Sequence, residues 1–491
     1  MPGDLSLAAA SDLLALYRTK RVSPVTVVEA CLKRIAAENC VVNAYCLVDE
    51  EGALKAARDS EARWAKGRPR GSLDGVPVSI KDLILTKGWP TLRGSRTIEA
   101  NQPWNDDAPV SARLKEQGAI ALGKTTTPEF GWKGVTDNSL TGITRNPFDP
   151  SKTPGGSSGG AAVAVACGMG PLAIGTDGGG SIRIPAGFTG IFGLKPSYGR
   201  VPAWPLSIFG TLAHLGPMTR AVTDAALLLN VISAPDWRDW SALPATETQD
   251  FTTGLEDGIA GLRFAFSMKS HGMPVDEEVA ALVAGAAKVF AELGAAVEEV
   301  DPEIGDAYEI FRTHWWAGAR QVVCGVPQEK RPLLDPLLRG MADTAAAITL
   351  DDYFKATQAR GQFGARLKMF SADYPILLTP TLPIAAFAAG SIAPETMFEP
   401  EGSWASWTPF SYPFNLTQQP AATVPCGFTK AGLPVGLQIV GPMYDDKLVL
   451  RVARAFEKAR PWADSYNRIP GTLKLALSEC GKGDDQKRVS K

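Results

Sequence analysis

Residues 155–199 read GGSSGGAAVAVACGMGPLAIGTDGGGSIRIPAGFTGIFGLKPSYG, a stretch dominated by glycine and other small residues. It holds 14 of the 49 glycines of the chain and only three charged residues, Asp177, Arg183 and Lys195. We expect a segment with so little charge to be buried, since charged side chains rarely lie in a protein interior without a partner. Glycine at this density allows the backbone to approach another segment or a ligand closely.

Two blocks in this stretch place a serine beside consecutive glycines. They are Gly155–Gly160, which contains Ser157, and Gly178–Arg183, which contains Ser181. One interpretation is a pair of tight turns whose serines cap the local backbone. The other is an acyl-transfer site in which consecutive backbone N–H groups form a nest for a developing oxyanion. The donors of that nest would be Gly178, Gly179, Gly180 and Ser181.

A serine nucleophile needs a base, and histidine is the usual one. The chain has only three histidines, His214, His271 and His314. Their surroundings in the sequence indicate core or surface positions. A lysine can act instead if burial keeps it neutral. Lys81 is the candidate, because it follows the apolar run Val76–Ile80, and its alternative role is an ion pair with Asp82 or another carboxylate.

The composition of the 491 residues narrows the class of protein. Lys and Arg total 50 against 52 for Asp and Glu, so no basic surface for nucleic acid is indicated. A hydrophobic fraction of 45% with 21% charged residues is typical of a globular protein. The longest apolar stretch, residues 161–174, is too short and too interrupted by glycine and proline to span a bilayer.

The seven cysteines are odd in number and form no CxxC pair. We therefore expect reduced thiols in a cytoplasmic protein, and neither a disulfide framework nor a structural zinc. Asp4 and Asp12 interrupt the apolar residues of the N-terminus, so no signal peptide is predicted.

Hydrophobic periodicity predicts helices that alternate with short strands. Ser23-Pro24 marks the start of a helix over 24–38, because serine caps the first turn and proline suits its first position. Residues 262–266, 276–293 and 296–300 are predicted as strand, helix and strand, the pattern of a sheet flanked by helices. The length allows about three domains or one large α/β domain. Further helices are predicted at 5–17, 110–117, 161–167, 223–232, most of 304–368 and 447–458, and further strands at 75–80, 119–122, 376–378, 422–424 and 436–440.

Several motifs together resemble the amidase signature family. They are Gly155–Gly160, Gly175–Arg183, Pro185-Ala186 and Gly193–Pro196, with Gly75–Asp82 upstream, Gly123–Thr125, Pro128-Glu129 and Asn146-Pro147 between, and Pro434–Gln438 downstream. The resemblance extends over residues 5–465, and the two serine blocks are its most specific part. It implies a single large α/β/α sandwich with a central mixed β-sheet over residues 1–470. Residues 471–491 would then be a polar C-terminal tail, which we expect to be mobile.

The resemblance also implies roles for three side chains. Ser181 matches the family's acylated nucleophile, Ser157 its bridging serine after a cis peptide bond, and Lys81 its general base. Ser181 would attack an amide carbonyl while its proton passes through Ser157 to neutral Lys81. The proton would then go to the leaving nitrogen, and water would hydrolyse the acyl-enzyme.

The backbone around the nucleophile is similar to the family's oxyanion hole, with one departure. The family usually has Thr or a similar residue where this chain has Gly178. Asp177 and Arg183 resemble the family's structural pair, for which we expect no catalytic role.

The implied activity is hydrolysis of a carboxylic amide to an acid plus ammonia or an amine. The substrate would be a small molecule, with no nucleic acid, membrane, metal or organic cofactor involved, and the enzyme a monomer or homodimer. The family also includes the glutamine-hydrolysing subunit of a tRNA-dependent amidotransferase, which works with a second chain. That subunit is the alternative.

The substrate pocket is expected to come from aromatic and apolar residues outside the serine blocks. The candidates are Phe130, Gly131, Trp132, Ile208, Phe209, Trp315 and Trp316. Their character favours an apolar or aryl group over glutamine. Anilides, aryl amides, carbamates and simple esters are all compatible with it.

Three further motifs are typical of other functions, but their sequence context does not support those functions. Gly118–Thr125 fits the phosphate-loop pattern, but a predicted strand fills the loop and Pro128 follows at once. Gly155–Gly159 fits the nucleophile elbow of α/β-hydrolases, yet no histidine follows His314. Asn415-Leu-Thr417 fits the glycosylation pattern, which has little meaning in a cytoplasmic chain.

Overall fold

Eleven strands of the described chain form one mixed β-sheet. The computed structural model describes residues 4–244, 250–270, 273–305, 307–397 and 404–469. The strands of the sheet are β1 (Tyr45–Val48), β2 (Pro77–Lys81), β3 (Ile120–Thr125), β6 (Leu172–Asp177), β7 (Phe192–Lys195), β8 (His214–Thr219), β9 (Arg263–Phe266), β10 (Ala296–Glu299), β11 (Ile376–Pro380), β12 (Ala421–Phe428) and β13 (Pro434–Val440). A separate short pair joins β4 (Asp137–Asn138) and β5 (Gly142–Ile143).

The order of strands in the sheet is β1-β3-β2-β6-β8-β7-β12-β13-β11-β9-β10. β2 runs parallel to both β3 and β6, and β9 runs parallel to both β10 and β11. The remaining neighbours are antiparallel. The parallel pairing of β2 and β6 matters for the site, because it brings the carboxyl ends of these two strands to the same edge.

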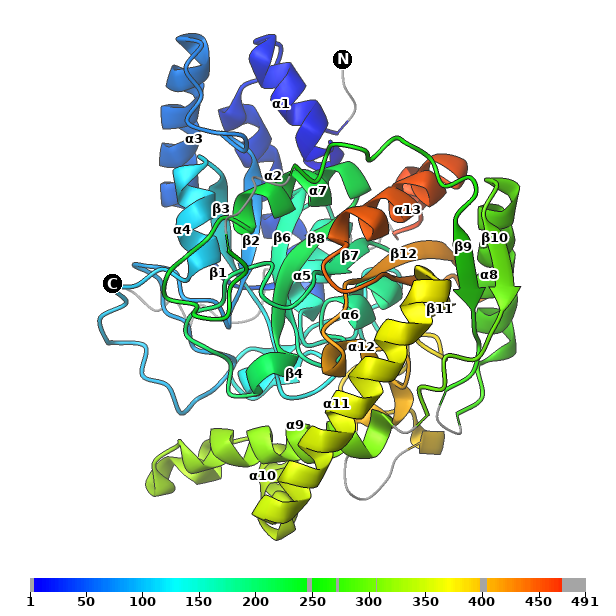
Figure 1. Cartoon of the computed structure of the whole chain (residues 1–491). Coiled ribbons are helices and arrows are strands. Elements are labelled where there is room, and N and C mark those ends of the chain that lie inside the picture. The colour runs from blue at the N-terminus through cyan, green and yellow to red at the C-terminus, as the bar shows by residue number, and fades with distance from the viewer. Residues whose placement is uncertain (1–3, 245–249, 271–272, 306, 398–403, 470–491) are drawn as a thin grey trace.

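Helices cover the sheet, as the sequence predicts for an α/β protein (Figure 1). They are α1 (Ala10–Arg18), α2 (Pro24–Val42), α3 (Glu50–Ala65), α4 (Pro109–Glu116), α5 (Gly159–Ala166), α6 (Arg183–Thr189), α7 (Val222–Ile232), α8 (Glu277–Glu292), α9 (Ala307–Cys324), α10 (Pro336–Thr344), α11 (Leu350–Asp373), α12 (Pro413–Leu416) and α13 (Asp446–Ala459). α5 and α6 contact each other and the centre of the sheet, and α7, α8 and α13 form another connected group on it. α9, α10 and α11 pack together at the bottom of the view in Figure 1.

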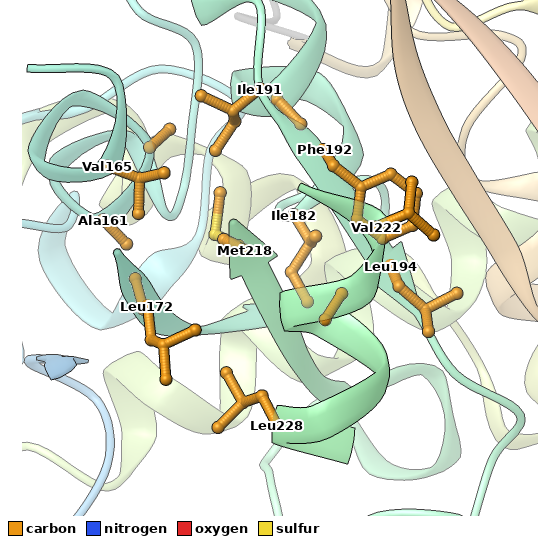
Figure 2. Packing of buried hydrophobic residues seen from close by; sticks show 14 of the residues in the cluster. Ala161, Val165, Leu172, Ile182, Ile191, Phe192, Leu194, Met218, Val222 and Leu228 are labelled. Atoms are coloured by element: carbon orange, nitrogen blue, oxygen red, sulfur yellow. The ribbon is translucent and has the colours of Figure 1, made fainter. Parts of the chain in front are cut away.

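Two clusters of buried apolar side chains hold these layers together. The larger cluster follows the sheet, and Figure 2 shows Ala161 and Val165 of α5 near Leu172 of β6 and Met218 of β8. The second cluster is rich in aromatic rings and joins α9, α10 and α11 to the segment around α12. The single large α/β/α sandwich with a central mixed sheet is thus the observed fold. The predicted tail at 471–491 lies outside the described residues.

The predicted helix start at Pro24 is confirmed, whereas the predicted helix over 5–17 begins later. Ser23 caps α2 by accepting the Val25 N–H at 3.0 Å. At the N-terminus, Leu5–Leu7 forms a separate 3₁₀ turn, and α1 starts only at Ala10. The Asp4 carboxylate accepts the Ser6 N–H at 3.1 Å, which favours the short turn over a continuous helix.

Close packing at the start of α5 requires glycine at position 160. A Cβ at Gly160 would lie 2.5 Å from both the Ala44 carbonyl oxygen and the Thr126 nitrogen, which are backbone atoms. We expect Gly160→Ala to lower the free energy of unfolding by about 1–3 kcal/mol. In the control Gly364→Ala the new Cβ on α11 meets no atom within 4 Å, so alanine should stabilise by about 0.5–1 kcal/mol. Urea denaturation followed by circular dichroism measures both changes. Equal effects at the two positions would contradict the close packing.

Candidate active site

The carboxyl end of β2 delivers Lys81 into the interior. The strand Pro77–Lys81 is buried along its whole length, and the Lys81 side chain is fully buried. Ile80 pairs with Ile174 of parallel β6, so Lys81 lies beside the last residues of that strand. The Lys81 amino group lies 2.8 Å from Thr176 Oγ1 there.

The first glycine-serine block meets Lys81 from the side of α5. Lys81 Nζ lies 2.6 Å from Ser157 Oγ and 2.9 Å from Ser158 Oγ. The Gly156-Ser157 peptide bond is cis, as the resemblance implies. The Ser158 N–H donates to the Ser181 carbonyl at 3.1 Å, which joins the two blocks. The structure therefore brings Lys81, Ser157 and Ser181 together from segments far apart in the chain.

The environment of Lys81 favours its neutral form. Burial lowers the pKa of the Lys81 amino group well below its usual value, and the Asp177 carboxylate opposes this shift only in part. The alternative of an ion pair with Asp82 is not observed. The Asp82 carboxylate accepts the Gly94 N–H at 3.3 Å, while Lys81 is surrounded by hydroxyl groups. A buried, neutral lysine hydrogen-bonded to a serine can act as a general base.

The second block forms a tight loop between β6 and α6. Asp177 ends β6, and its carboxylate accepts the Gly180 N–H at 2.8 Å and the Ile182 N–H at 3.2 Å. Gly180 has φ +125°, a conformation that favours glycine. The Gly180 N–H is therefore engaged by Asp177, which corrects its assignment to the oxyanion nest. Within the described residues, the N–H groups of Gly178, Gly179 and Ser181 have no protein acceptor.

Asp177 and Arg183 form a fully buried ion pair that fixes this loop. Arg183 Nη2 lies 2.9 Å from Asp177 Oδ1, and Arg183 Nη1 donates to Gln438 at 2.8 Å. Burial alone would raise the pKa of Asp177, but the Arg183 charge holds it below its usual range. Asn415 also donates to Asp177 at 2.9 Å and is fully buried, so it is not accessible for glycosylation.

Removal of Arg183 is expected to be strongly destabilising. In Arg183→Leu the buried Asp177 carboxylate loses its ion pair, which should lower the free energy of unfolding by about 3–5 kcal/mol. Urea denaturation measures the loss. The control Arg312→Leu breaks a more exposed pair with Glu309 (2.8 Å) and should change stability far less. If both variants lose the same stability, the buried pair does not hold the loop.

A pocket opens beside the two catalytic serine candidates. Ser157 and Ser181 line it, together with Thr176 and Gly178. Five of the seven predicted pocket residues also line it, namely Phe130, Gly131, Ile208, Phe209 and Trp315. The Phe209 ring stacks on the Trp315 ring with centroids 3.9 Å apart. The pocket thus joins the serines to an apolar, aromatic wall.

Trp132 and Trp316 do not line the pocket, contrary to the prediction. Both are buried in the aromatic cluster, Trp132 at 0% and Trp316 at 2% exposure. The Trp132 backbone carbonyl accepts the Trp315 indole N–H at 3.1 Å, so Trp132 supports the wall from behind. The sequence could not show which of the adjacent Trp315 and Trp316 rings faces the cavity, because successive residues of a helix point in different directions.

Other residues of the pocket were not predicted from the sequence. Arg93 and Trp204 line it from two separate loops, and Tyr198 and His214 line it near β8. Glycine- and proline-containing loops such as 199–210 carry no periodic signal, so nothing in the local sequence pointed to them. Trp204-Pro205 contains a cis peptide bond.

Neither of the two described histidines, His214 and His314, supplies a base in this arrangement. Nδ1 of buried His214 donates to the Leu212 carbonyl at 2.8 Å, and burial lowers the pKa of the ring well below its usual value. The His314 ring packs edge-on against the Tyr353 ring, and His314 does not line the pocket. His271 lies outside the described residues.

The structure also rejects the phosphate-loop interpretation of Gly118–Thr125. Residues Ile120–Thr125 form β3, and Lys124 is buried, donating to the Ile84 carbonyl and to Thr91 Oγ1. No phosphate could reach its amino group there. Of the helices in the described ranges, none is both long enough and apolar enough to cross a membrane.

Comparisons with known proteins identify the family of the chain. The Amidase family model matches residues 26–450. An acylamidase of Rhodococcus erythropolis is 38% identical over 469 residues, covering 94% of this chain and 97% of that protein. A glutamyl-tRNA(Gln) amidotransferase subunit of Chloroflexus aurantiacus is 36% identical, covering 95% of this chain and 98% of the relative.

A solved structure shows the same fold. The crystal structure of a bacterial aryl acylamidase of the amidase signature family superposes with a TM-score of 0.87 at 32% sequence identity. The match covers 94% of this chain and 98% of the aryl acylamidase. With a family match over most of its length and relatives that align almost end to end, the chain belongs to the amidase signature family, hydrolases that act on amide C–N bonds.

Proposed function

We propose that this amidase uses Ser181 as its nucleophile, Ser157 as a proton bridge and Lys81 as its general base. The observation that carries the proposal is the contact between buried Lys81 and Ser157 at 2.6 Å, at the wall of a pocket that Ser181 also lines. Burial keeps the pKa of Lys81 low, so the amine can accept a proton.

In the first half-reaction, Ser181 Oγ forms a bond to the amide carbonyl carbon, and its proton passes through Ser157 to Lys81. The resulting oxyanion lies near the unoccupied N–H groups of Gly178, Gly179 and Ser181. The proton returns to the amide nitrogen as the C–N bond breaks, leaving an acyl-enzyme. Water then attacks the ester carbonyl and passes a proton through Ser157 to Lys81; as the ester C–O bond breaks, the proton returns to Ser181 Oγ and the carboxylic acid is released.

The substrate class that the pocket favours is an amide with an aryl or other apolar group. The stacked rings of Phe209 and Trp315, with Phe130 and Ile208, form an apolar wall beside the serines. Such a wall binds apolar surface of a ligand by removing it from water. The likeness to an acylamidase and to an aryl acylamidase supports the same class.

The second candidate is a glutamine-hydrolysing amidotransferase subunit, which the 36% identity to such subunits favours. That role would require a partner chain, whereas an amidase of small molecules would act as a monomer or homodimer. The free thiols of Cys31, Cys46 and Cys167 support a cytoplasmic location for either role.

A panel of purified substrates tests the proposal. We expect release of arylamine from p-nitroanilides and other anilides, and the turnover of primary amides, carbamates and p-nitrophenyl esters is measured beside it. Glutaminase activity, or co-purification of a larger partner, with no anilide hydrolysis would instead support the amidotransferase role.

A further inference from the structure

One cation that lines the pocket makes no ion pair with the described residues. Arg93 lines the pocket and is half-buried. In the described part of the chain, no carboxylate lies within 4.0 Å of its guanidinium, and the group donates no hydrogen bond to the protein. The Asp82 carboxylate acts on it only at longer range, where it opposes the lowering of the Arg93 pKa by burial. An arginine stays charged in proteins, so this half-buried guanidinium keeps hydrogen-bond donors that a ligand in the pocket can use.

The backbone at Arg93 is held in a fixed turn. Arg93 has φ +54°, in the left-handed region that glycine adopts more easily, and Gly94 follows with φ +63°. The Asp82 carboxylate accepts the Gly94 N–H at 3.3 Å. Asp82 therefore fixes the turn through the backbone, while the Arg93 guanidinium is left without an ion pair.

Arg93 also belongs to the wall that carries the reacting serines. The Arg93 carbonyl accepts the Phe130 N–H at 2.8 Å. The next residue, Gly131, is so close to the site that a Cβ there would lie 3.3 Å from Ser157 Oγ. The segments that carry Arg93, Phe130 and Ser157 are thus in continuous contact along one side of the pocket.

The described pocket lining carries charge of one sign only, which is positive. Arg93 is its single ionic side chain among the described residues, and no Asp or Glu lines it. A substrate carboxylate would find a guanidinium, whereas a substrate ammonium group would find no counter-charge. This excludes a good fit for a zwitterion such as free glutamine, whose ammonium would be buried unpaired.

We propose that Arg93 binds a carboxylate of the substrate, so that the preferred substrates are aryl or apolar amides that carry one carboxylate and no ammonium group. This specificity rests on the proposed amidase function. The guanidinium presents a planar pair of N–H donors that matches a carboxylate, and the aromatic wall holds the apolar remainder.

Matched pairs of anilides test the proposal. 4-Acetamidobenzoate is compared with 4-isopropylacetanilide, and succinanilate with 4-methylpentananilide, so that a carboxylate replaces an isopropyl group of similar shape on the amine side or on the acyl side. In one of these two pairs, we expect kcat/KM for the carboxylate substrate to be about 10- to 100-fold higher than for its isopropyl analogue. This is the range that a hydrogen-bonded ion pair supplies. Which pair responds shows which side of the scissile bond faces Arg93.

Substitutions of Arg93 test whether this residue causes the preference for the carboxylate substrate. Arg93→Gln should remove the preference for the carboxylate within the responding pair, and Arg93→Glu should reverse it towards an amine-bearing analogue. Arg93→Lys should restore part of it. The matched control is Arg96→Gln, which removes an exposed arginine three residues away that does not line the pocket, and it should leave the preference intact. Thermal unfolding confirms that each variant is folded.

Binding to the Ser181→Ala variant separates this inference from the proposed function. Calorimetry with the same four anilides measures affinity without turnover, and we expect the carboxylate of the responding pair to bind about 10-fold or more tightly. Equal affinity within both pairs overturns the role of Arg93, even if the wild type hydrolyses anilides. Selective binding without hydrolysis by the wild type overturns the proposed function and leaves the role of Arg93 supported.

Discussion

Ser181→Ala is expected to abolish covalent labelling by a fluorophosphonate probe and to reduce kcat/KM for amides by about 10⁴-fold or more. The reason is that its hydroxyl oxygen forms the bond to the carbonyl carbon, and no other group of the loop can replace it. Active-site labelling followed by peptide mass spectrometry should place the probe on Ser181 in the wild type.

The control for this experiment is another serine of the same pocket. Ser207 also lines the pocket, and its hydroxyl accepts the Phe209 N–H at 3.2 Å, but it lies on a loop away from Lys81. Ser207→Ala should still be labelled. Labelling of Ser181→Ala at the wild-type rate would eliminate Ser181 as the nucleophile, and loss of labelling only in Ser207→Ala would reassign that role.

Lys81→Met is expected to lower kcat/KM by about 10²- to 10⁴-fold, the usual contribution of a general base. Methionine fills much of the same buried volume but cannot accept a proton. The pH dependence of the wild type gives the second part of the result. Neutral Lys81 is the active form, so kcat/KM should fall as pH decreases through its pKa and reach a plateau above it. Because burial lowers that pKa, the plateau should begin well below pH 10.5.

Lys124 provides a matched control for this assignment. It is also buried, on the neighbouring strand β3, and burial lowers its pKa to about 8. Its amino group donates to Thr91 Oγ1 at 2.8 Å rather than to the catalytic serine candidates. Lys124→Met should retain the acidic limb of the pH profile in its remaining activity. If the limb disappears in Lys124→Met and persists in Lys81→Met, the base is wrongly assigned.

Local sequence patterns were sufficient for elements with a strong periodic signal. The predicted strand, helix and strand at 262–300 correspond to β9, α8 and β10, with β9 and β10 parallel as in a βαβ unit. The helix predicted at 161–167 corresponds to α5, and that at 447–458 to α13. In these segments the apolar residues recur at the spacing of the element itself, so burial of one face selects the structure.

The strands β6, β7 and β8 were not predicted, although they form the centre of the sheet. β6 and β7 are buried on both faces, and each contains a glycine, so they lack the alternation of apolar and polar residues that marks a half-buried strand. α3 was also missed, because the apolar residues among its 16 positions are mostly alanine and only Ala53, Ala57 and Ser60 are buried. In these segments the contacts with neighbouring elements, not the local pattern, determine the structure.

The amino-acid sequence was enough to identify two serine blocks, a lysine after an apolar strand and the absence of a plausible histidine base, because these depend on residue type and on spacing along the chain. It could not show that Lys81 meets Ser157, that Asp177 engages the Gly180 N–H, that Trp132 and Trp316 face the core, or that Arg93 stands unpaired in the pocket. Each of these depends on contacts between segments that are distant in the chain. Such contacts arise only when strands and loops pack, since packing decides which donors are paired, which rings are buried and which charge is left for a ligand.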